Sequence, residues 1–521
     1  MKQTRAQLCI LMILLAPALA LAQEGSARRN DAPRLPPAAR ETPPNLPLNA
    51  PLVMIPKPAA CSPTQSAVAE PHAASGIILT LADAIAIGLR DNRTIRSAYI
   101  DRIAQKFDLR VAEDRFTPQF SVDGSAVRQR VARINATTAE VTPATTVLLP
   151  TGATFGFSWV STLSDVAGVR DRNSTAELSV VQPLLRGGGI DVNRAPVRTA
   201  RLAEKVNQLQ LKATVSETVG QIIFAYRALL EAQEELKLAQ GSFARARDLL
   251  DTNCALIAAG RMAAVDVVQT EADLENQNIR VLEAINSLDA ARLQFLNLLS
   301  LDLGTKVVAR ESTAPAQIMP NLDRLMPIAL AERPDYLGQL LVVEQNKLGI
   351  VVARNAKLWD LSVFASGRFG RDVTSGLASE STHISDVTVG MAFNIPLNDL
   401  TRKQPYVQAT TTLQTSELQL VAIRQGVELQ VRDSVTEVNI RWRQLEAARR
   451  AKEFAARAVD IEKEKLSVGR SSNFQVRLME NDLRSAENQQ LSAMIGYLNA
   501  LTLLDLQLGT TLSTWRIELR D

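Results

Sequence analysis

The chain has 521 residues, and its 58 basic and 55 acidic side chains give a formal net charge of +3. Hydrophobic residues make up 46% and charged residues 22%, which is ordinary for a folded protein and excludes a disordered one. A charge this close to neutral argues against a nucleic-acid binder. Two histidines and three cysteines leave little for a metal site or a Cys/His nucleophile, so we expect no metal, no cofactor and no enzyme.

The N-terminus has the pattern of a secretory signal peptide. Lys2 and Arg5 precede an apolar run from Leu8 to Leu15, and small residues follow as far as Ala22. The apolar run is shorter than the ~20 residues that span a membrane, which makes a membrane anchor the weaker interpretation. We therefore predict a signal peptide over residues 1–22.

A proline-rich segment over residues 23–75 comes next, and its composition predicts an extended linker. A lipoprotein signal places a cysteine at the end of the apolar run, whereas Cys9 lies inside that run and Cys61 far beyond it. Acylation is therefore not expected. A disulfide between Cys61 and Cys254 stays open, with nothing in the sequence to favour it.

The rest of the chain contains one sequence pattern that occurs twice, over residues 76–314 and 315–521. Pro196 and Pro405 open proline-free tracts of 118 and 116 residues, and Gly260 and Gly469 follow them at the same distance. Such tracts predict long helices, each with its proline in the first turn. Because the segments around the two glycines and at the two tract ends align in the same order, we infer a tandem duplication.

Each tract predicts a long helix, a turn at the glycine and a shorter helix. We expect helices over Pro196–Ile257, about Pro405–Leu466, Val265–Leu299 and Phe474–Leu504. The first long helix has two neighbouring apolar stripes, which favours packing on both flanks, as in a tube of helices, over a two-stranded coiled coil with one stripe. A helix of about 90 Å cannot bury both stripes within one chain, so oligomerisation is implied.

Between the helices, apolar residues alternate with small or polar ones, which predicts β-strands. The predicted strands are Gln119–Val127, Thr145–Leu149, Ala153–Val160 and Ala176–Leu184 in the first repeat, and Leu361–Phe369 and Ser385–Ile395 in the second. Residues 161–174 and 372–383 are predicted to be polar exterior loops.

This alternation suits a transmembrane β-barrel whose outer face meets lipid, with a soluble sheet as the alternative. One chain has too few strands to close a barrel, so several chains are needed. Two strands per repeat in a trimer would give 12 strands. The additional hairpin over residues 145–160 either extends the barrel or folds outside it.

The chain resembles the outer-membrane efflux protein family, the TolC type, over about residues 77–510. Four kinds of stretch carry the likeness: Leu79–Asn92, Pro118–Val122, Gln182–Gly188 with its echo Ile395–Leu397, and the two turn regions Ala259–Val267 and Val468–Val476. The resemblance implies a mainly α fold with membrane β, in which a homotrimer joins a long-helix α-barrel to a shared transmembrane β-barrel.

The resemblance also implies a function without catalysis. Family members conduct small molecules or polypeptides through the outer membrane in efflux or type I secretion, and they extend into the periplasm. Their partners are a periplasmic adaptor, an inner-membrane transporter and outer-membrane lipid. The alternative is a periplasmic coiled-coil adaptor or scaffold without a pore, although such a protein would contain one helical hairpin rather than a repeated unit of hairpin and strands.

Two sets of site residues follow from the resemblance. The glycine turns would be periplasmic tips that contact the adaptor, and they comprise Ala259, Gly260, Arg261, Val468, Gly469 and Arg470. Acidic residues just after these turns can ring the narrow end of the tunnel in the family. Asp266 matches that position, whereas Gln475 stands there in the second repeat, and both are candidates for the constriction. Arg261 and Arg470 are either tip ion pairs or parts of solvated turns.

One pair of carboxylates needs a separate interpretation. Glu271 and Glu480 occupy equivalent positions in the two repeats. We interpret them as part of a solvated helix face rather than as a catalytic pair.

Overall fold

The computed structural model describes residues 76–131, 134–261, 263, 265–310, 315–375 and 379–519. The predicted signal peptide, the predicted linker and Cys61 lie outside the described residues. All described residues belong to one compact unit.

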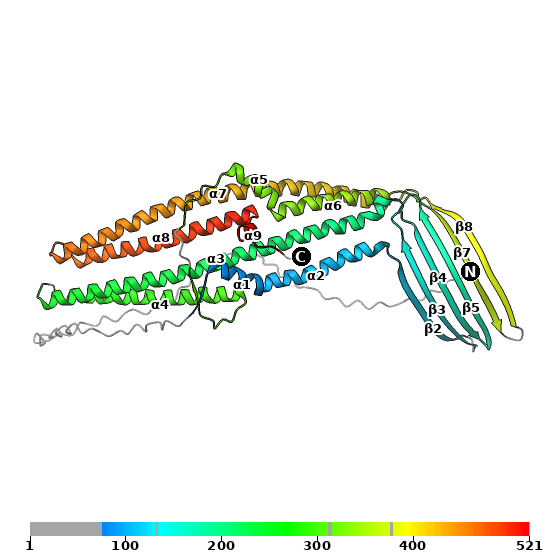
Figure 1. The fold of residues 1–521 in the computed structure, drawn as a ribbon, viewed down its shortest axis with the longest axis horizontal. Helices are drawn as coiled ribbons and strands as arrows, with labels where there is room; N and C mark the ends of the chain where they lie inside the picture. The colour runs from blue at the N-terminus through cyan, green and yellow to red at the C-terminus, as the bar shows by residue number, and fades with distance from the viewer. Residues whose placement is uncertain are drawn as a thin grey trace, which may run out of the picture. The chain divides into compact units, whose positions relative to one another are not determined.

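Helices and strands follow one another in two similar series (Figure 1). The first series is β1 (Ile77–Leu79), α1 (Leu81–Asp91), α2 (Arg93–Glu113), a short 3₁₀ turn (Asp114–Phe116), β2 (Gln119–Val131), β3 (Ile134–Leu148), β4 (Thr154–Val166), β5 (Val169–Pro183), α3 (Ile190–Ala258), α4 (Val265–Leu299) and β6 (Val307–Ala309). The second series is α5 (Leu322–Glu332), α6 (Pro334–Ala356), β7 (Asp360–Ser375), β8 (Ser379–Asn394), α7 (Gln404–Ser467), α8 (Asn473–Leu508) and α9 (Thr511–Thr514).

The long helices agree closely with the prediction, with one correction. Helix α7 begins beside Pro405, as expected, but α3 begins at Ile190 and contains Pro196 within its length. The backbone carbonyls of Gly187 and Gly189 accept hydrogen bonds from the Asn193 side chain, which holds this additional turn in place. The prediction failed because Pro196 is the seventh residue of α3, where the helix tolerates the loss of one backbone hydrogen bond, so a proline does not mark the first turn uniquely.

Six strands form one antiparallel sheet in the order β2-β3-β4-β5-β7-β8. The first series contributes four strands and the second two, as predicted, and the additional hairpin extends the sheet rather than folding outside it. The predicted polar loops were wrong. Residues 161–174 and 372–383 fall almost entirely within strands, and β4 and β5 are joined by a tight turn at Ala167 and Gly168. Polar composition suggested loops there, but the backbone groups of these residues are paired across the sheet.

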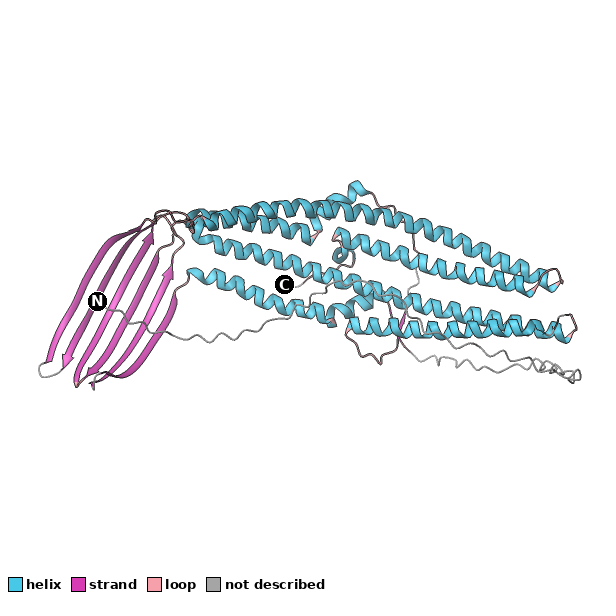
Figure 2. Ribbon diagram, turned by 180° about the vertical axis from the view of Figure 1, so that it is seen from behind, coloured by secondary structure: helices cyan, strands magenta, loops and turns pink. Residues whose placement is uncertain are grey.

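Next to the sheet, the helices lie side by side in the order α2, α3, α6, α7 (Figure 2). Farther from the sheet, the order is α4, α3, α8, α7. Helix α3 therefore has neighbours on both flanks along its length, which confirms the prediction from its two apolar stripes. The core is centred on α3, where Val215, Val219, Ile222, Tyr226 and Leu229 are fully buried. The helices at the ends of these two side-by-side orders, α2, α4 and α7, each have one flank without a neighbour in the chain.

Candidate functional site

The six-stranded sheet has one apolar and one polar face. Residues opposite each other in an antiparallel ladder place their side chains on the same side, so the strand register assigns each residue to a face. We call the first the apolar face; its large side chains include Phe120, Val122, Val141, Phe155, Phe157, Trp159, Leu178, Val363, Phe369, Val387, Val389, Met391 and Phe393. The polar face has mainly Ser, Thr and acidic residues at the alternating positions.

Exposure on these faces is the reverse of that in a soluble sheet. In β4, Phe155, Phe157 and Trp159 are 39%, 46% and 51% exposed, while the small residues between them are half-buried. A soluble sheet buries its large apolar side chains and leaves the small polar ones in water. An apolar face that is left uncovered along six strands matches the lipid-facing surface of a membrane barrel.

The height of the apolar band approaches the ~25 Å of a membrane barrel. On β7 it runs from Leu361 to Phe369, which is eight residue steps or about 27 Å along the strand. At the tilt of about 40° that barrel strands adopt, the band covers roughly 20 Å of membrane thickness.

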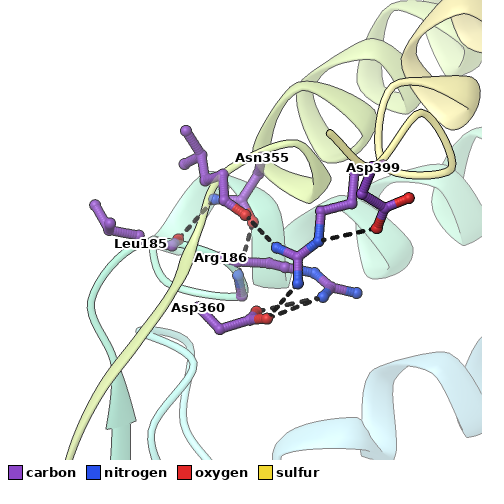
Figure 3. Close-up of polar contacts among 8 residues, drawn as sticks. Leu185, Arg186, Asn355, Asp360 and Asp399 are labelled. Carbon is purple, nitrogen blue, oxygen red and sulfur yellow. Dashed lines mark hydrogen bonds and ion pairs between the residues drawn. The ribbon is translucent and has the colours of Figure 1, made fainter. Parts of the chain in front are cut away.

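The strands join the helices through a cluster of charged side chains contributed by both series (Figure 3). The Asp360 carboxylate at the start of β7 accepts hydrogen bonds from Arg402 Nη2 at 2.6 Å and from Arg186 Nη1 at 3.3 Å. Arg402 also donates to the Leu358 carbonyl at 3.0 Å and lies 3.8 Å from the Asp399 carboxylate. The junction is therefore held by a shared carboxylate rather than by an apolar core.

Asn355 completes this junction. Its side chain donates to the Leu185 carbonyl at 2.9 Å and accepts from the Gly187 N–H at 2.7 Å (Figure 3). It thereby attaches the end of α6 to the turn between β5 and α3. The sequence analysis marked the turn at Gln182–Gly188 but not Asn355, Asp360 or Arg402, because their contacts join segments between 42 and 174 residues apart and leave no local pattern.

The two glycine turns have matching geometry at the far ends of the helices. Gly260 and Gly469 adopt left-handed φ angles of 66° and 74°, which glycine adopts without strain. The N–H of Arg261 donates to the Leu256 carbonyl at 2.9 Å, and the N–H of Arg470 donates to the Lys465 carbonyl at 2.8 Å. Both turns are therefore the same helix C-terminal cap.

The predicted tip residues occupy these turns. Ala259 and Val468 are the C-cap residues that directly follow α3 and α7, and Arg261 and Arg470 are exposed. The side chains of Arg261 and Arg470 make no ion pair with the described residues, which agrees with solvated turns.

The candidate constriction residues lie in the first turn of the following helices. Gln475 is exposed, and its N–H donates to Ser472 at the N-terminus of α8. Asp266 lies in the first turn of α4, but its side chain is outside the described part of the structure.

The two tips border a shared cleft of about 420 Å³. Arg261 and Gln269 from the first hairpin and Gly469, Phe474 and Arg477 from the second are among its lining residues. Arg477 crosses between the hairpins and donates to the Gln269 carbonyl at 3.3 Å.

A carboxylate beside the cleft is held in its charged form. The Ser471 hydroxyl donates a hydrogen bond to Glu462, and Lys465 pairs with the same carboxylate at 2.9 Å. The hydrogen bond from Ser471 and, to a smaller extent, the contact with Lys465 hold the pKa of Glu462 below its usual range.

Glu480 has a different environment from the one predicted. Its carboxylate pairs with Arg245 of α3 at 2.9 Å and with Lys463 of α7 at 2.5 Å, and its side chain is 17% exposed. Glu480 therefore bridges the two hairpins instead of lying on a solvated face, whereas Glu271 is exposed as expected. The sequence could not show this, because the two basic partners come from different helices.

Comparison with known proteins agrees with this geometry. The family model of the outer membrane efflux protein matches residues 88–300 and 325–510. A curated relative, the cobalt-zinc-cadmium resistance protein CzcC of Cupriavidus metallidurans, is 26% identical over 234 residues, which is 44% of this chain and 51% of the relative. The matched region thus spans about half the length of that relative.

Solved channel structures share the fold. The CmeC outer membrane channel of Campylobacter jejuni is 15% identical, with a TM-score of 0.63 over 82% of this chain and 85% of that one. CusC is 15% identical, with a TM-score of 0.61 over 83% and 93%. The outer membrane protein VceC of Vibrio cholerae is 13% identical, with a TM-score of 0.62 over 82% and 96%. The chain belongs to the outer membrane efflux protein family, and it is located in the outer membrane with its helices extending into the periplasm.

Proposed function

We propose that the chain forms a homotrimeric exit duct that lets solutes pass from the periplasm through the outer membrane. The observation that carries this proposal is the uncovered apolar face of the sheet, which suits contact with lipid. The described residues include no candidate metal cluster of three or more His, Cys, Asp or Glu side chains, and the matched proteins are transport channels.

The trimer is supported by the two uncovered flanks of the chain. Helix α7 has exposed apolar residues at a regular spacing of 11, which keeps them on one side of the helix: Val407, Leu418, Leu429 and Ile440. Helix α2, at the opposite flank, has its own exposed stripe: Ile100, Ile103, Phe107 and Val111. Strands β8 and β2 are the free edges of the sheet on the same two sides.

These flanks complement each other when one copy is placed beside the next. The α7 stripe would pack on the α2 stripe of the neighbour while β8 pairs with its β2. Such a head-to-tail contact closes into a ring, and each added copy buries one stripe of each kind. Nearer the tips, the exposed Ile279 and Leu282 of α4 would meet Phe454 and Ile461 of α7 in the same way.

Three copies of the six-stranded sheet would give a barrel of 18 strands rather than 12. Barrel diameter grows roughly linearly with strand number, so this barrel would be about 1.5 times as wide. The polar face would line the lumen. Its acidic residues, such as Asp123, Glu140 and Asp386, favour the passage of cations.

We propose that the two helical hairpins derive from a tandem duplication and that their tips contact a periplasmic adaptor, which links the duct to an inner-membrane transporter. The matching caps at Gly260 and Gly469, with exposed Arg261 and Arg470, offer two similar surfaces for such a contact. Asp266 and Gln475, one turn farther along, would lie at the narrow end of the tunnel.

The name of the CzcC relative concerns cobalt, zinc and cadmium. Metal cations are therefore one class of cargo to test, and an acidic lumen suits them.

The test is to purify the protein from outer membranes and measure single-channel conductance in planar bilayers. We expect a heat-modifiable trimer that conducts ions. A water-soluble monomer without conductance would contradict the proposal and favour the scaffold without a pore, for which an uncovered apolar sheet face has no use.

A further inference from the structure

The charged side chains of the six strands are sorted between the two faces of the sheet. On the apolar face, the charged or titratable residues are Arg128, Arg130, Arg170, Arg172, Arg371, His383 and one acid, Asp165. On the polar face they are Asp123, Glu140, Asp171, Glu177, Asp360, Asp372, Glu380, Asp386 and one base, Arg368.

Each of the two exceptions is neutralised by the residue opposite it in the ladder. Asp165 pairs with Arg170 at 3.1 Å, and Arg368 pairs with Glu177 at 3.2 Å. After these pairs are set aside, the remaining charge is positive on the apolar face and negative on the polar face. Charges that served only to keep the strand ends in water would be mixed on both faces.

The basic residues occupy the hairpin-turn end of the apolar face, a level several residues tall along the strands that also holds Leu163 and Val373. On β7, Arg371 follows Phe369, and on β2, Arg128 follows Ala126, each at the next position on that face. These positions lie toward the hairpin turns, at the end of the strands away from the helices. Because the helices are periplasmic, this level corresponds to the headgroups of the outer leaflet. We call Arg128, Arg130, Arg172, Arg371 and His383 the basic belt.

The belt arginines are available for a ligand. Arg128, Arg130 and Arg172 are exposed, and none makes a side-chain hydrogen bond or ion pair within the described part of the chain. Arg371 donates only to the Ser381 hydroxyl, at 3.0 Å. A guanidinium donates two parallel hydrogen bonds to a phosphate group and is desolvated more easily than an ammonium group.

We propose that the basic belt binds the phosphate groups of anionic glycolipids in the outer leaflet. The proposal rests on the proposed function, because the sheet must span the outer membrane for the belt to reach that level. Attraction between basic residues and anionic headgroups adds for each arginine near the membrane surface, so several arginines on each chain would hold a ring of lipids around the barrel.

The test compares two glycolipids that differ only in phosphate. The purified trimer is titrated with bis-phosphorylated lipid A and with phosphate-free lipid A, and the bound lipids are counted by native mass spectrometry. The variant R128Q/R172Q/R371Q removes three belt charges, and R424Q/R443Q/R450Q removes the same number from exposed positions on α7. Conductance is measured on each preparation.

We expect the wild type and the α7 variant to prefer the phosphorylated lipid, and the belt variant to lose about tenfold or more in its affinity. In a trimer that conducts, any of three results would overturn this inference and leave the proposed exit duct unaffected. They are equal binding of both lipids, displacement of the lipid by millimolar inorganic phosphate, and unchanged lipid binding by the belt variant. A preparation that does not conduct would overturn both.

Discussion

Arg402, just before α7, donates a hydrogen bond to Asp360, the first residue of β7, at 2.6 Å, and the arginine side chain is only 16% exposed. Asp360 also accepts from Arg186 of the other series of elements. One carboxylate thus holds both strand-to-helix connections of the chain.

This arrangement predicts that Asp360→Asn weakens the junction. The variant removes the charge that two guanidinium groups share. Only Arg402 is shielded, whereas Asp360 and Arg186 are 39% and 46% exposed, so we expect a loss on the order of 1–2 kcal/mol. We expect a lower dissociation temperature of the trimer on heat-modifiability gels. Asp191→Asn, which breaks the exposed pair with Arg198, is the control and should change little. Equal effects of the two variants would show that the junction is not specially stabilised.

The uncovered stripes predict two single substitutions that prevent assembly. Phe107→Glu on α2 and Leu418→Glu on α7 each place a charge where the neighbouring copy would bury it, and these side chains are 62% and 72% exposed in one chain. We expect monomers or unfolded chains in place of the trimer on native gels. Asp108→Lys, at an adjacent exposed position of α2, should still assemble. Trimers formed by either glutamate variant would exclude these stripes from the interface.

The sequence was sufficient for the features that depend on local periodicity. The long helices, the glycine turns and the six strand-like segments could be predicted because Gly260, Gly469 and the alternating residues of β4 leave local patterns, whereas the place of the additional hairpin stayed open. Polar strand ends such as residues 161–174 could not, because their strands are defined by pairing across the sheet.

The same reason explains the contacts that prediction missed. Asp360 with Arg402 and Glu480 with Arg245 pair over long sequence distances, which only the folded chain brings together. The sorting of charge between the two faces also required the strand register, since a single strand shows only a few of these residues.

A buried ion pair between α2 and α3 predicts a pH dependence of stability. Arg102 donates to both oxygens of Glu204, at 2.9 and 2.5 Å, and the two side chains are 6% and 12% exposed. The hydrogen bond from Arg102 lowers the pKa of Glu204 below its usual value of 4.5 despite burial. The pair therefore adds stability above about pH 4.5, and this contribution disappears as the pH falls through the lowered pKa.

Glu204→Gln should accordingly reduce the free energy of unfolding at pH 7 by on the order of 3 kcal/mol, which lowers the thermal unfolding temperature. The difference in unfolding temperature from the wild type should shrink below pH 4. Helical circular dichroism during heating measures this. Glu113→Gln is the matched control, since its exposed pair with Arg201 joins the same two helices. A deficit that persists unchanged at low pH would mean that packing, not charge, is lost.

The tip of the first hairpin predicts an effect on ion selectivity. If Asp266 lines the narrow end of the duct, Asp266→Ala lowers the preference for cations, and Gln475→Glu raises it by restoring an acid in the second repeat. Reversal potentials in a salt gradient across planar bilayers measure both. Asp101→Asn on α2, far from the tips, should leave the potential unchanged. Unchanged selectivity in the two tip variants would remove these residues from the constriction.

The additional hairpin predicts that the barrel can be narrowed. Deleting residues 132–166 places Val131 where Val166 stands opposite Val169, so the Ala167–Gly168 turn joins β2 directly to β5. Each remaining strand keeps its faces, because Gln129 and Ser164, which would occupy equivalent positions, both fall on the polar face in the present register. A trimer of this variant would have 12 strands, and its barrel diameter should fall by about one third in end-on views by electron cryomicroscopy.

Deleting 133–166 instead shifts the β2 register by one residue and turns its apolar side chains toward the lumen, so that variant should not reach the membrane. A barrel of unchanged width in the first variant would show that β3 and β4 do not take part in its closure.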